Sequence, residues 1–358
     1  MGASLSATPR LASVDALRGV TVAAMLLVNF PGDAEHVFGP LRHADWNGIT
    51  AADVIFPTFL FISGVSISLA PVATASTRGE LAQASRKILV RAARIIGLAL
   101  FCALLVFFLS GQSSFRVWGV LQRIGLCYAA AAIISIYFKP KTQWGIAAFI
   151  LIAYAALLHF GGGTSPLGNP VDRVDTALLG SMLYHYDPAT GHGHDPEGLL
   201  STFPAIATTI IGVRAGEWLK QGRLNILTAF GFGALAAGYA WSLLLPLNKN
   251  LWTPSFVILV AGISTLALAM AHYLVDQRGL PPLGRDFGRN AIVAYVGSGI
   301  LAVTLLGLGV WPMYHQAFAR LAPIAGAGAA SLLFSISYVA VWALIVHVMG
   351  KLGWRVRL

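Results

Sequence analysis

Ten long runs of apolar residues dominate this sequence and limit the folds open to the chain. A membrane-spanning helix needs about 20 mostly apolar residues, whereas a strand of a membrane barrel needs only about 10 with alternating character. Only 11% of the residues are charged, against about 25% in soluble domains. The sequence therefore predicts an all-α, polytopic integral membrane helical bundle, a single domain over residues 1–358 with about ten transmembrane helices. The predicted spans are residues 13–30, 52–70, 90–110, 117–138, 143–160, 198–218, 225–245, 252–274, 290–310 and 329–350.

The distribution of Lys and Arg between the connecting segments predicts the orientation. When these segments are assigned alternately to two sides, 16 basic residues fall on the side of both termini and 5 on the other. Cytoplasmic loops carry the excess of Lys and Arg, so both termini are predicted to be cytoplasmic and loops 31–51 and 161–197 external. The 16 are Arg10, Arg78, Arg86, Lys87, Arg91, Arg94, Lys139, Lys141, Lys220, Arg223, Arg278, Arg285, Arg289, Lys351, Arg355 and Arg357. The net charge of +10 thus reflects topology and requires no nucleic-acid partner.

A polar cluster, "RHADWNG" at residues 42–48, stands directly before the span 52–70. A histidine there is suited to proton transfer because imidazole titrates near neutral pH. Asp53 either caps the start of the helix, where the dipole favours a carboxylate, or orients His43. Asn29, at the outer end of the first span, either bonds to helix backbone or serves the same site. The sequence leaves both alternatives open.

Polar residues within the spans are candidates for function because burial of such groups in a membrane is costly. Asp15 and Arg18 are three residues apart, which favours an ion pair on one helix face. Gln122 and Arg123 lie in an apolar helix and are expected to face a polar cavity or a bound anion.

The long external segment 161–197 contains histidines of the types that bind metals. His185, His192 and His194 precede Asp195, but no rigid element is expected to frame them. Metal sites need such ligands at fixed positions. We therefore predict no metal site.

Several unusual stretches resemble those of one enzyme family. They are "RLASVDALRG", "LLVNF", "HADWNGITAADVIFPTFLFISG", "GVLQRIGL", "DPEGLLSTFPAI", "GVRAGEWL", "LPLNKNLWTPSF" and "GRNAIVAYVG". In order and composition they are similar to the heparan-α-glucosaminide N-acetyltransferase family of transmembrane acyltransferases, in a compact bacterial form. The resemblance extends from residue 10 to about residue 297.

The resemblance implies an activity and a location. The family moves an acetyl group from cytosolic acetyl-CoA to the amine of a glucosamine unit across the membrane. By this resemblance the chain is expected to be a multi-pass protein of the bacterial inner membrane, contacting lipids and forming a homodimer. The acceptor is glucosamine, a related amino sugar or an amine on an envelope polysaccharide.

The resemblance also assigns the catalytic histidine, which lies in the motif matched by "HADWNG" and is His43 here. The imidazole either takes a proton from the sugar amine or carries the acetyl group itself. Asp53 or Asp45 would orient the ring, and Asn29 or Asn47 would donate to the developing oxyanion. The residues expected to bind the amino sugar are Asp45, Trp46, Asp195 and Glu197.

The phosphates of acetyl-CoA require guanidinium and ammonium groups. The candidates, with one amide, are Arg86, Lys87, Arg91, Gln122, Arg123, Arg285 and Arg289. Some of these cations could instead anchor helices to anionic lipid headgroups.

A transporter of amino sugars is the alternative from a different class, because ten spans with buried polar groups also suit import. Transporters commonly show interrupted helices in matching halves of the chain. The sequence has no such internal symmetry, and we therefore favour the acyltransferase.

Overall fold

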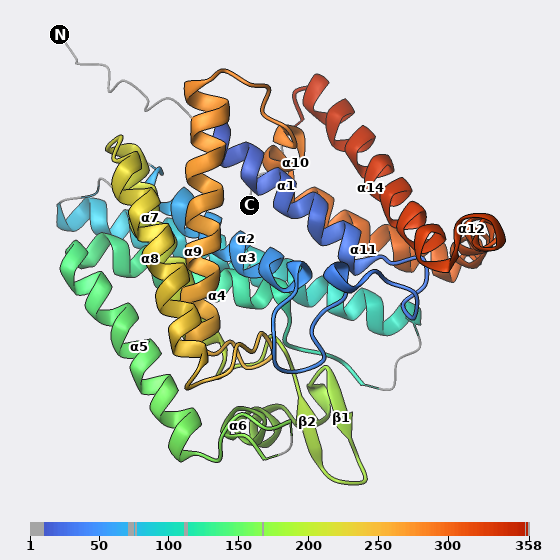
Figure 1. Cartoon of the computed structure of the whole chain (residues 1–358), viewed down its shortest axis with the longest axis horizontal. Helices are drawn as coiled ribbons and strands as arrows, with labels where there is room; N and C mark the ends of the chain where they lie inside the picture. Colours follow the sequence, from blue (N-terminus) through green and yellow to red (C-terminus); the bar gives the residue numbers. More distant parts are fainter. Residues whose placement is uncertain are drawn as a thin grey trace.

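The computed structural model describes residues 11–70, 75, 77–110, 114–166, 168–354 and 356. Helices form nearly all of its regular structure (Figure 1). The longer helices are α1 (Ala12–Asn29), α2 (Ala51–Ser68), α3 (Arg78–Ser110), α4 (Val120–Tyr137), α5 (Pro140–Phe160), α7 (Thr202–Lys220), α8 (Leu224–Ser242), α9 (Pro254–Ala271), α11 (Ala291–Gly307) and α14 (Ala327–Lys351). The shorter elements are η1 (Gly39–Leu41), α6 (Pro170–Leu179), η3 (Gly180–Met182), β1 (His185–Asp187), β2 (His192–His194), η4 (His272–Gln277), α10 (Arg285–Arg289), α12 (Val310–Ala319) and α13 (Ala322–Ala325).

Each of the ten predicted spans overlaps one of the longer helices. Among the described residues, eight helices are long and apolar enough to cross a membrane, which confirms the helical membrane class. A ninth span is possible if α11 and the following helices α12 and α13 are joined, although the chain bends by 95° between them. The number ten therefore stays a prediction, because α7 does not meet the criterion and α11 meets it only when it is joined to the helices that follow.

The position of α7 explains its more polar composition. Most of its side chains are buried against α2, α4, α5 and α9, so they face protein rather than lipid. Two glycines allow α2 and α7 to touch along their backbones: a Cβ atom on Gly64 would lie 2.0 Å from the Thr209 carbonyl oxygen, and one on Gly212 would lie 2.1 Å from the Phe61 oxygen. Close backbone approach through small residues is typical of helix pairs in membranes.

The loops 31–51 and 161–197, which were predicted to be external, gather at one end of the bundle, which Figure 1 shows on the side of α6 and the hairpin of β1 and β2, away from the first turn of α1. The indole of Trp46 donates to the Thr164 carbonyl at 2.7 Å, and the amide of Asn248 donates to Asn47 at 3.0 Å. Loops far apart in sequence therefore meet there, as alternating spans require. Which side of the membrane this end faces remains a prediction.

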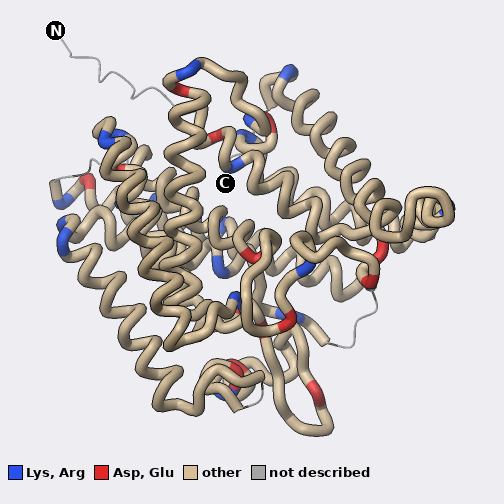
Figure 2. The backbone as a smooth tube through the Cα atoms, in the orientation of Figure 1, with Lys and Arg blue, Asp and Glu red and all other residues tan. Residues whose placement is uncertain are grey.

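Charged residues are sparse along the helices, and Figure 2 shows long central stretches without Lys, Arg, Asp or Glu. This pattern agrees with burial in a membrane. Three of the basic residues that were counted on the cytoplasmic side, Arg10, Arg355 and Arg357, lie outside the described residues.

Segment 161–197 has more regular structure than the sequence indicated. Asn169 caps α6 by accepting a hydrogen bond from the Asp172 N–H at 2.8 Å, and Pro170 starts the helix. The strands β1 and β2 pair antiparallel, with His185 opposite His194. The expectation that no rigid element frames these histidines is thus wrong. The signal that was missed is Asn-Pro, a common start of a helix.

Candidate active site

His43 and Asp53 form the centre of the site. A hydrogen bond of 2.8 Å joins the His43 Nδ1 atom to the Asp53 Oδ1 atom. The Asp53 side chain is buried, with 1% of its surface exposed, whereas 44% of the His43 side chain is exposed. The predicted contact between these residues is present, and it leaves the other ring nitrogen on the accessible side.

Asp53 holds this position because of the local sequence at the start of α2. Its Oδ2 atom accepts from the backbone N–H and the hydroxyl of Thr50, both at 3.0 Å, which makes a capping box. The same oxygen accepts from the Ala44 N–H at 3.1 Å. Both contacts expected of Asp53 are therefore present: one oxygen caps the helix and the loop, and the other bonds to the imidazole, while its role in catalysis stays a prediction.

Lys249 joins this pair from the loop between α8 and α9. Its Nζ atom lies 3.1 Å from His43 Nδ1, 3.4 Å from His43 Nε2 and 3.7 Å from Asp53 Oδ1. Burial lowers the pKa of Lys249, and the carboxylates of Glu197 and Asp53 oppose this shift. The sequence interpretation did not assign Lys249 to the site, although it lies in the stretch "LPLNKNLWTPSF" that carried the resemblance.

An ion-pair cluster lies at the same end of the bundle. Arg116 Nη2 is 2.6 Å from Asp195 Oδ1 and 2.8 Å from Glu197 Oε2, and Arg116 Nε donates to Asp195 Oδ2 at 3.0 Å. The guanidinium also lies 4.5 Å from the centre of the Tyr184 ring. Asp195 and Glu197 were predicted to bind the sugar; the structure pairs both of them with Arg116, and sugar binding stays a prediction.

The ion pairs determine the charges of this cluster. Burial alone would raise the pKa of Glu197, but the positive charges of Arg116, Arg123 and Lys249 outweigh it and hold the pKa below its ordinary value. Burial likewise disfavours the charged form of Arg116, but the two carboxylates reverse this effect and raise the pKa of Arg116. Arg116 and Glu197 are therefore both favoured in their charged forms, and each can hold a polar group of a ligand through its remaining hydrogen-bonding positions.

The loop of His43 also contains three other predicted site residues, Asp45, Trp46 and Asn47. Asp45 is exposed, and Asn47 accepts the hydrogen bond from Asn248. Trp46 bonds to the loop that follows α5, and its ring lies 5.1 Å from that of His194. Trp46 and Asn47 thus connect the loops around His43.

Gln122 and Arg123 of α4 bond to nearby backbone. Gln122 donates to the Val117 carbonyl at 2.8 Å. Arg123 is fully buried, donates to the Gly198 carbonyl at 3.1 Å and to the Ser201 hydroxyl, and lies 4.8 Å from the ring of Trp252. These contacts link α4 to the "DPEG" segment near the ion-pair cluster. A role in binding phosphates is a prediction that these contacts do not favour.

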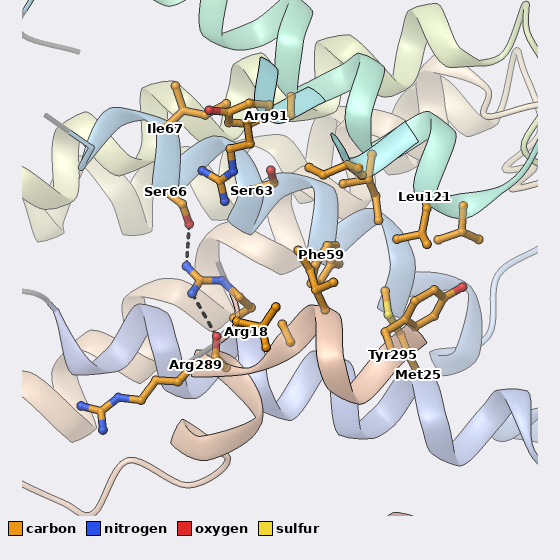
Figure 3. Close-up of a pocket in the computed structure, with 18 of the residues that line it drawn as sticks. Arg18, Met25, Phe59, Ser63, Ser66, Ile67, Arg91, Leu121, Arg289 and Tyr295 are labelled. Atoms are coloured by element: carbon orange, nitrogen blue, oxygen red, sulfur yellow. Dashed lines mark hydrogen bonds between the residues drawn. The ribbon is translucent and has the colours of Figure 1, made fainter. Parts of the chain in front are cut away.

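A cavity of about 360 Å³ lies between α1, α2, α3, α4 and α11 (Figure 3). Arg18, Arg91 and Arg289 line it, as do Phe59, Ser63 and Ser66 on successive turns of α2, while the other candidate cations, Arg86, Lys87 and Arg285, do not. The remaining lining residues are Met25, Ile67, Ala70, Ile95, Val120, Leu121, Ile124, Tyr128, Gly288, Ala291, Ile292, Tyr295 and Val356. The cavity therefore combines three arginines in its lining with a mainly apolar wall.

Arg18 was predicted only to pair with Asp15, and that pair is present at 3.0 Å. The same guanidinium also donates to the Ser66 hydroxyl at 2.6 Å and to the Gly288 carbonyl at 3.2 Å, which fixes it at the cavity wall (Figure 3). Arg91 lies over the ring of Tyr128 at 4.8 Å. Sequence spacing revealed the pair with Asp15 but not that Arg18 would face a cavity.

Asn29 lines a second cavity of about 170 Å³. Leu121 and Tyr295 line both cavities, so the two are neighbours. Asn29 lies at the C-terminal end of α1, which is also the outer end of that helix in the predicted topology. This position suits a group near the reacting end of a ligand in the larger cavity.

One histidine of the hairpin, His194, pairs with a carboxylate of α6. The His194 Nδ1 atom bonds to Asp172 Oδ1 at 2.6 Å. Within the part of the chain that the structure describes, no group of three or more His, Cys, Asp or Glu side chains is arranged to bind a metal. The His194–Asp172 pair connects β2 to α6.

Comparison with known proteins supports the resemblance that the motifs indicated. The model of the family described as "Heparan-alpha-glucosaminide N-acetyltransferase, catalytic" matches residues 10–245. The heparan-alpha-glucosaminide N-acetyltransferases of Mus musculus and Homo sapiens are each 29% identical to the chain, over alignments that cover 83% and 81% of it. These alignments cover 54% and 52% of the two relatives, so the chain spans about half of their length.

Proposed function

Because the chain belongs to the heparan-alpha-glucosaminide N-acetyltransferase family, we propose that it is a transmembrane N-acetyltransferase that moves the acetyl group of acetyl-CoA to the amine of glucosamine or a related amino sugar. The observation that carries this proposal is the buried Asp53 carboxylate bonded to the accessible His43 ring. A carboxylate on Nδ1 holds the imidazole in the tautomer whose Nε2 atom can accept a proton.

The larger cavity suits the donor. Its three arginines would bind the phosphates of acetyl-CoA, and its apolar wall would hold the extended pantetheine arm. Along α2, 13 residues separate Ser66, which bonds to Arg18, from Asp53. At about 1.5 Å per residue this spans about 20 Å. An elongated donor whose phosphates lie near Arg18 would thus direct its thioester towards the His43 end.

In the proposed reaction the free amine attacks the thioester carbonyl. A C–N bond forms, the carbonyl π electrons move onto the oxygen, and His43 Nε2 takes a proton from the nitrogen. The oxyanion then re-forms the carbonyl, the C–S bond breaks, and the thiolate of CoA leaves and receives the proton from His43. A route through an acetyl-histidine is the competing version.

The Arg116 cluster would hold the acceptor. Its guanidinium and the oxygens of Asp195 and Glu197 can bond to sugar hydroxyls, and the Tyr184 ring beside them offers an apolar face.

We further propose that this end faces the periplasm of a bacterial inner membrane and that acetyl-CoA enters from the cytoplasm. We also propose that the protein works as a homodimer.

The test of the proposed function uses the purified full chain with acetyl-CoA and a panel of amino sugars. Wild type should release CoA and form the N-acetyl sugar, detected by mass spectrometry, and His43→Ala should lose about 10²–10⁴ in rate while still binding acetyl-CoA. His36→Ala is the matched control, because His36 is an exposed histidine of the same loop paired with Asp33 at 2.7 Å. Sugar uptake by proteoliposomes without acetyl-CoA, and no acetyl transfer, would instead favour the transporter.

The same experiment separates the two chemical routes. Wild type is incubated with acetyl-CoA and no acceptor, and the intact protein is weighed. An acetyl group on His43 that passes to added glucosamine would establish the acetyl-histidine route. An unmodified protein that transfers acetyl only when both substrates are present supports direct transfer.

A further inference from the structure

We propose that Lys249 is a catalytic residue whose ammonium group stabilises the oxyanion formed beside His43. This inference rests on the proposed acetyl transfer and assigns a residue to the part of the reaction that the amides Asn29 and Asn47 were expected to perform. In the structure Asn47 holds Asn248, the residue before Lys249, and Asn29 lines the second cavity.

The position of the Lys249 Nζ atom supports this role. It is 3.1 Å from His43 Nδ1 and 3.4 Å from Nε2, so it lies at similar distances from both ring nitrogens. In the plane of the ring the Cε1 atom would block such a position, and the ammonium therefore lies against a face of the imidazole. The in-plane lone pair of Nε2 is left free for the acceptor amine.

When the acceptor amine bonds to His43 Nε2, the thioester carbonyl that it attacks lies beside the imidazole, near the ring face against which the Lys249 ammonium packs. The oxygen that becomes negative is then two bonds from the attacking nitrogen and within reach of the ammonium. A buried positive charge acts there more strongly than one in water, because little solvent screens it. The Lys249 side chain is 14% exposed, which meets this condition.

The loop around Lys249 is fixed before any substrate binds. Gly48 N–H donates to the Leu247 carbonyl at 2.8 Å, and the Asn248 side chain accepts from the Leu251 N–H at 2.7 Å. Burial lowers the pKa of Lys249, and the nearby Arg123 acts in the same direction, while the carboxylates of Glu197 and Asp53 favour the charged form and oppose this shift. Because the Lys249 ammonium is already in position, the protein does not have to rearrange when the oxyanion forms.

The test compares Lys249→Met, which keeps the length of the side chain without its charge, with Lys249→Arg, which keeps a cation. The methionine variant should lose about 10²–10³ in kcat, the loss typical of removing one oxyanion donor. Its KM values for acetyl-CoA and glucosamine should stay within about threefold of wild type, because the contact is made only in the transition state. The arginine variant should recover at least about tenfold of the lost kcat. Lys220→Met, at the exposed end of α7, should match wild type.

The outcomes separate this inference from the proposed function. Absence of acetyl transfer by wild type would overturn both. If His43→Ala is inactive and Lys249→Met keeps full kcat, the role of Lys249 is overturned and the proposed function stands. Equal losses in the Lys249→Met and Lys249→Arg variants, or a change confined to KM, would overturn the role of Lys249 in the same way. If Lys249→Met does not bind acetyl-CoA or melts early, Lys249→Gln replaces it and the same loss in kcat is expected.

Discussion

Asp175 of α6 is a buried carboxylate that should make the stability of this protein depend on pH. Its side chain has no exposed surface, its Oδ1 atom accepts from the Leu200 N–H at 3.1 Å, and its Oδ2 atom has no hydrogen-bond partner among the described residues. Burial, with the nearby carboxylates of Asp172 and Asp195, raises the pKa of Asp175 to about 6, although the Leu200 N–H and Arg123 oppose the change.

The magnitude follows from the difference between a pKa of about 6 in the folded protein and the ordinary 3.8. Each pKa unit corresponds to about 1.4 kcal/mol, so the carboxylate costs about 3 kcal/mol once it is ionised. Because the pKa is higher in the folded state, the folded state binds the proton more tightly. The contribution of Asp175 to stability is therefore most favourable below about pH 4, falls as the pH rises towards 6, and is less favourable by about 3 kcal/mol above that.

Asp175→Asn keeps the shape of the side chain and cannot ionise. The variant should match wild type near pH 4 and exceed its stability at pH 7.5 by about 3 kcal/mol, which corresponds to roughly 5 °C in Tm for a chain of this length. Thermal melts of the purified chain in detergent between pH 4 and 8 measure this, with Glu35→Gln, an exposed acid, as the control. An identical Tm for Asp175→Asn and wild type at pH 7.5, or a difference that is constant across the pH range, would refute the reasoning.

Three further predictions follow from the cavity, the helix packing and the topology. Arg91→Ala should weaken the binding of acetyl-CoA, measured by calorimetry, by about 10-fold or more, and should weaken that of acetyl-pantetheine much less because the lost contact is to phosphate. Gly64→Ala should destabilise the protein by about 1–3 kcal/mol, seen as a lower Tm, because its Cβ would meet the Thr209 carbonyl at 2.0 Å. Cysteines placed at Ser165 and Thr77 should react with an impermeant thiol reagent from opposite faces of the membrane, and labelling of both from one face would contradict the predicted topology.

The sequence alone determined the features that depend on neighbouring residues. The helical spans follow from apolar length, which a membrane imposes on each segment separately. The Asp15–Arg18 pair and the Thr50–Asp53 capping box are also local, because three residues place the partners on one turn. The contact between His43 and Asp53 could be expected because only ten residues separate them, in a loop short enough to fold back onto the helix, whereas the catalytic role of His43 was implied by the resemblance to the family.

Contacts between distant segments required the tertiary structure. Lys249 is 206 residues from His43, and Arg116 is 79 residues from Asp195, so no spacing rule brings either pair together. For the same reason the pairing of Asp195 and Glu197 with Arg116 is invisible in the sequence, and their role in binding the sugar stays a prediction.

Helix packing likewise decided which cations face the donor cavity. Arg18, Arg91 and Arg289 come from three different helices, while Arg86 and Lys87, only a few residues from Arg91, do not line the cavity. Apolar pattern shows that a helix enters the membrane, but a helix that is apolar on all sides carries little information about which neighbour each side will meet. The direction of each guanidinium is set by the packing of all the helices together, and the physical reason is that lipid and protein neighbours accept the same apolar side chains.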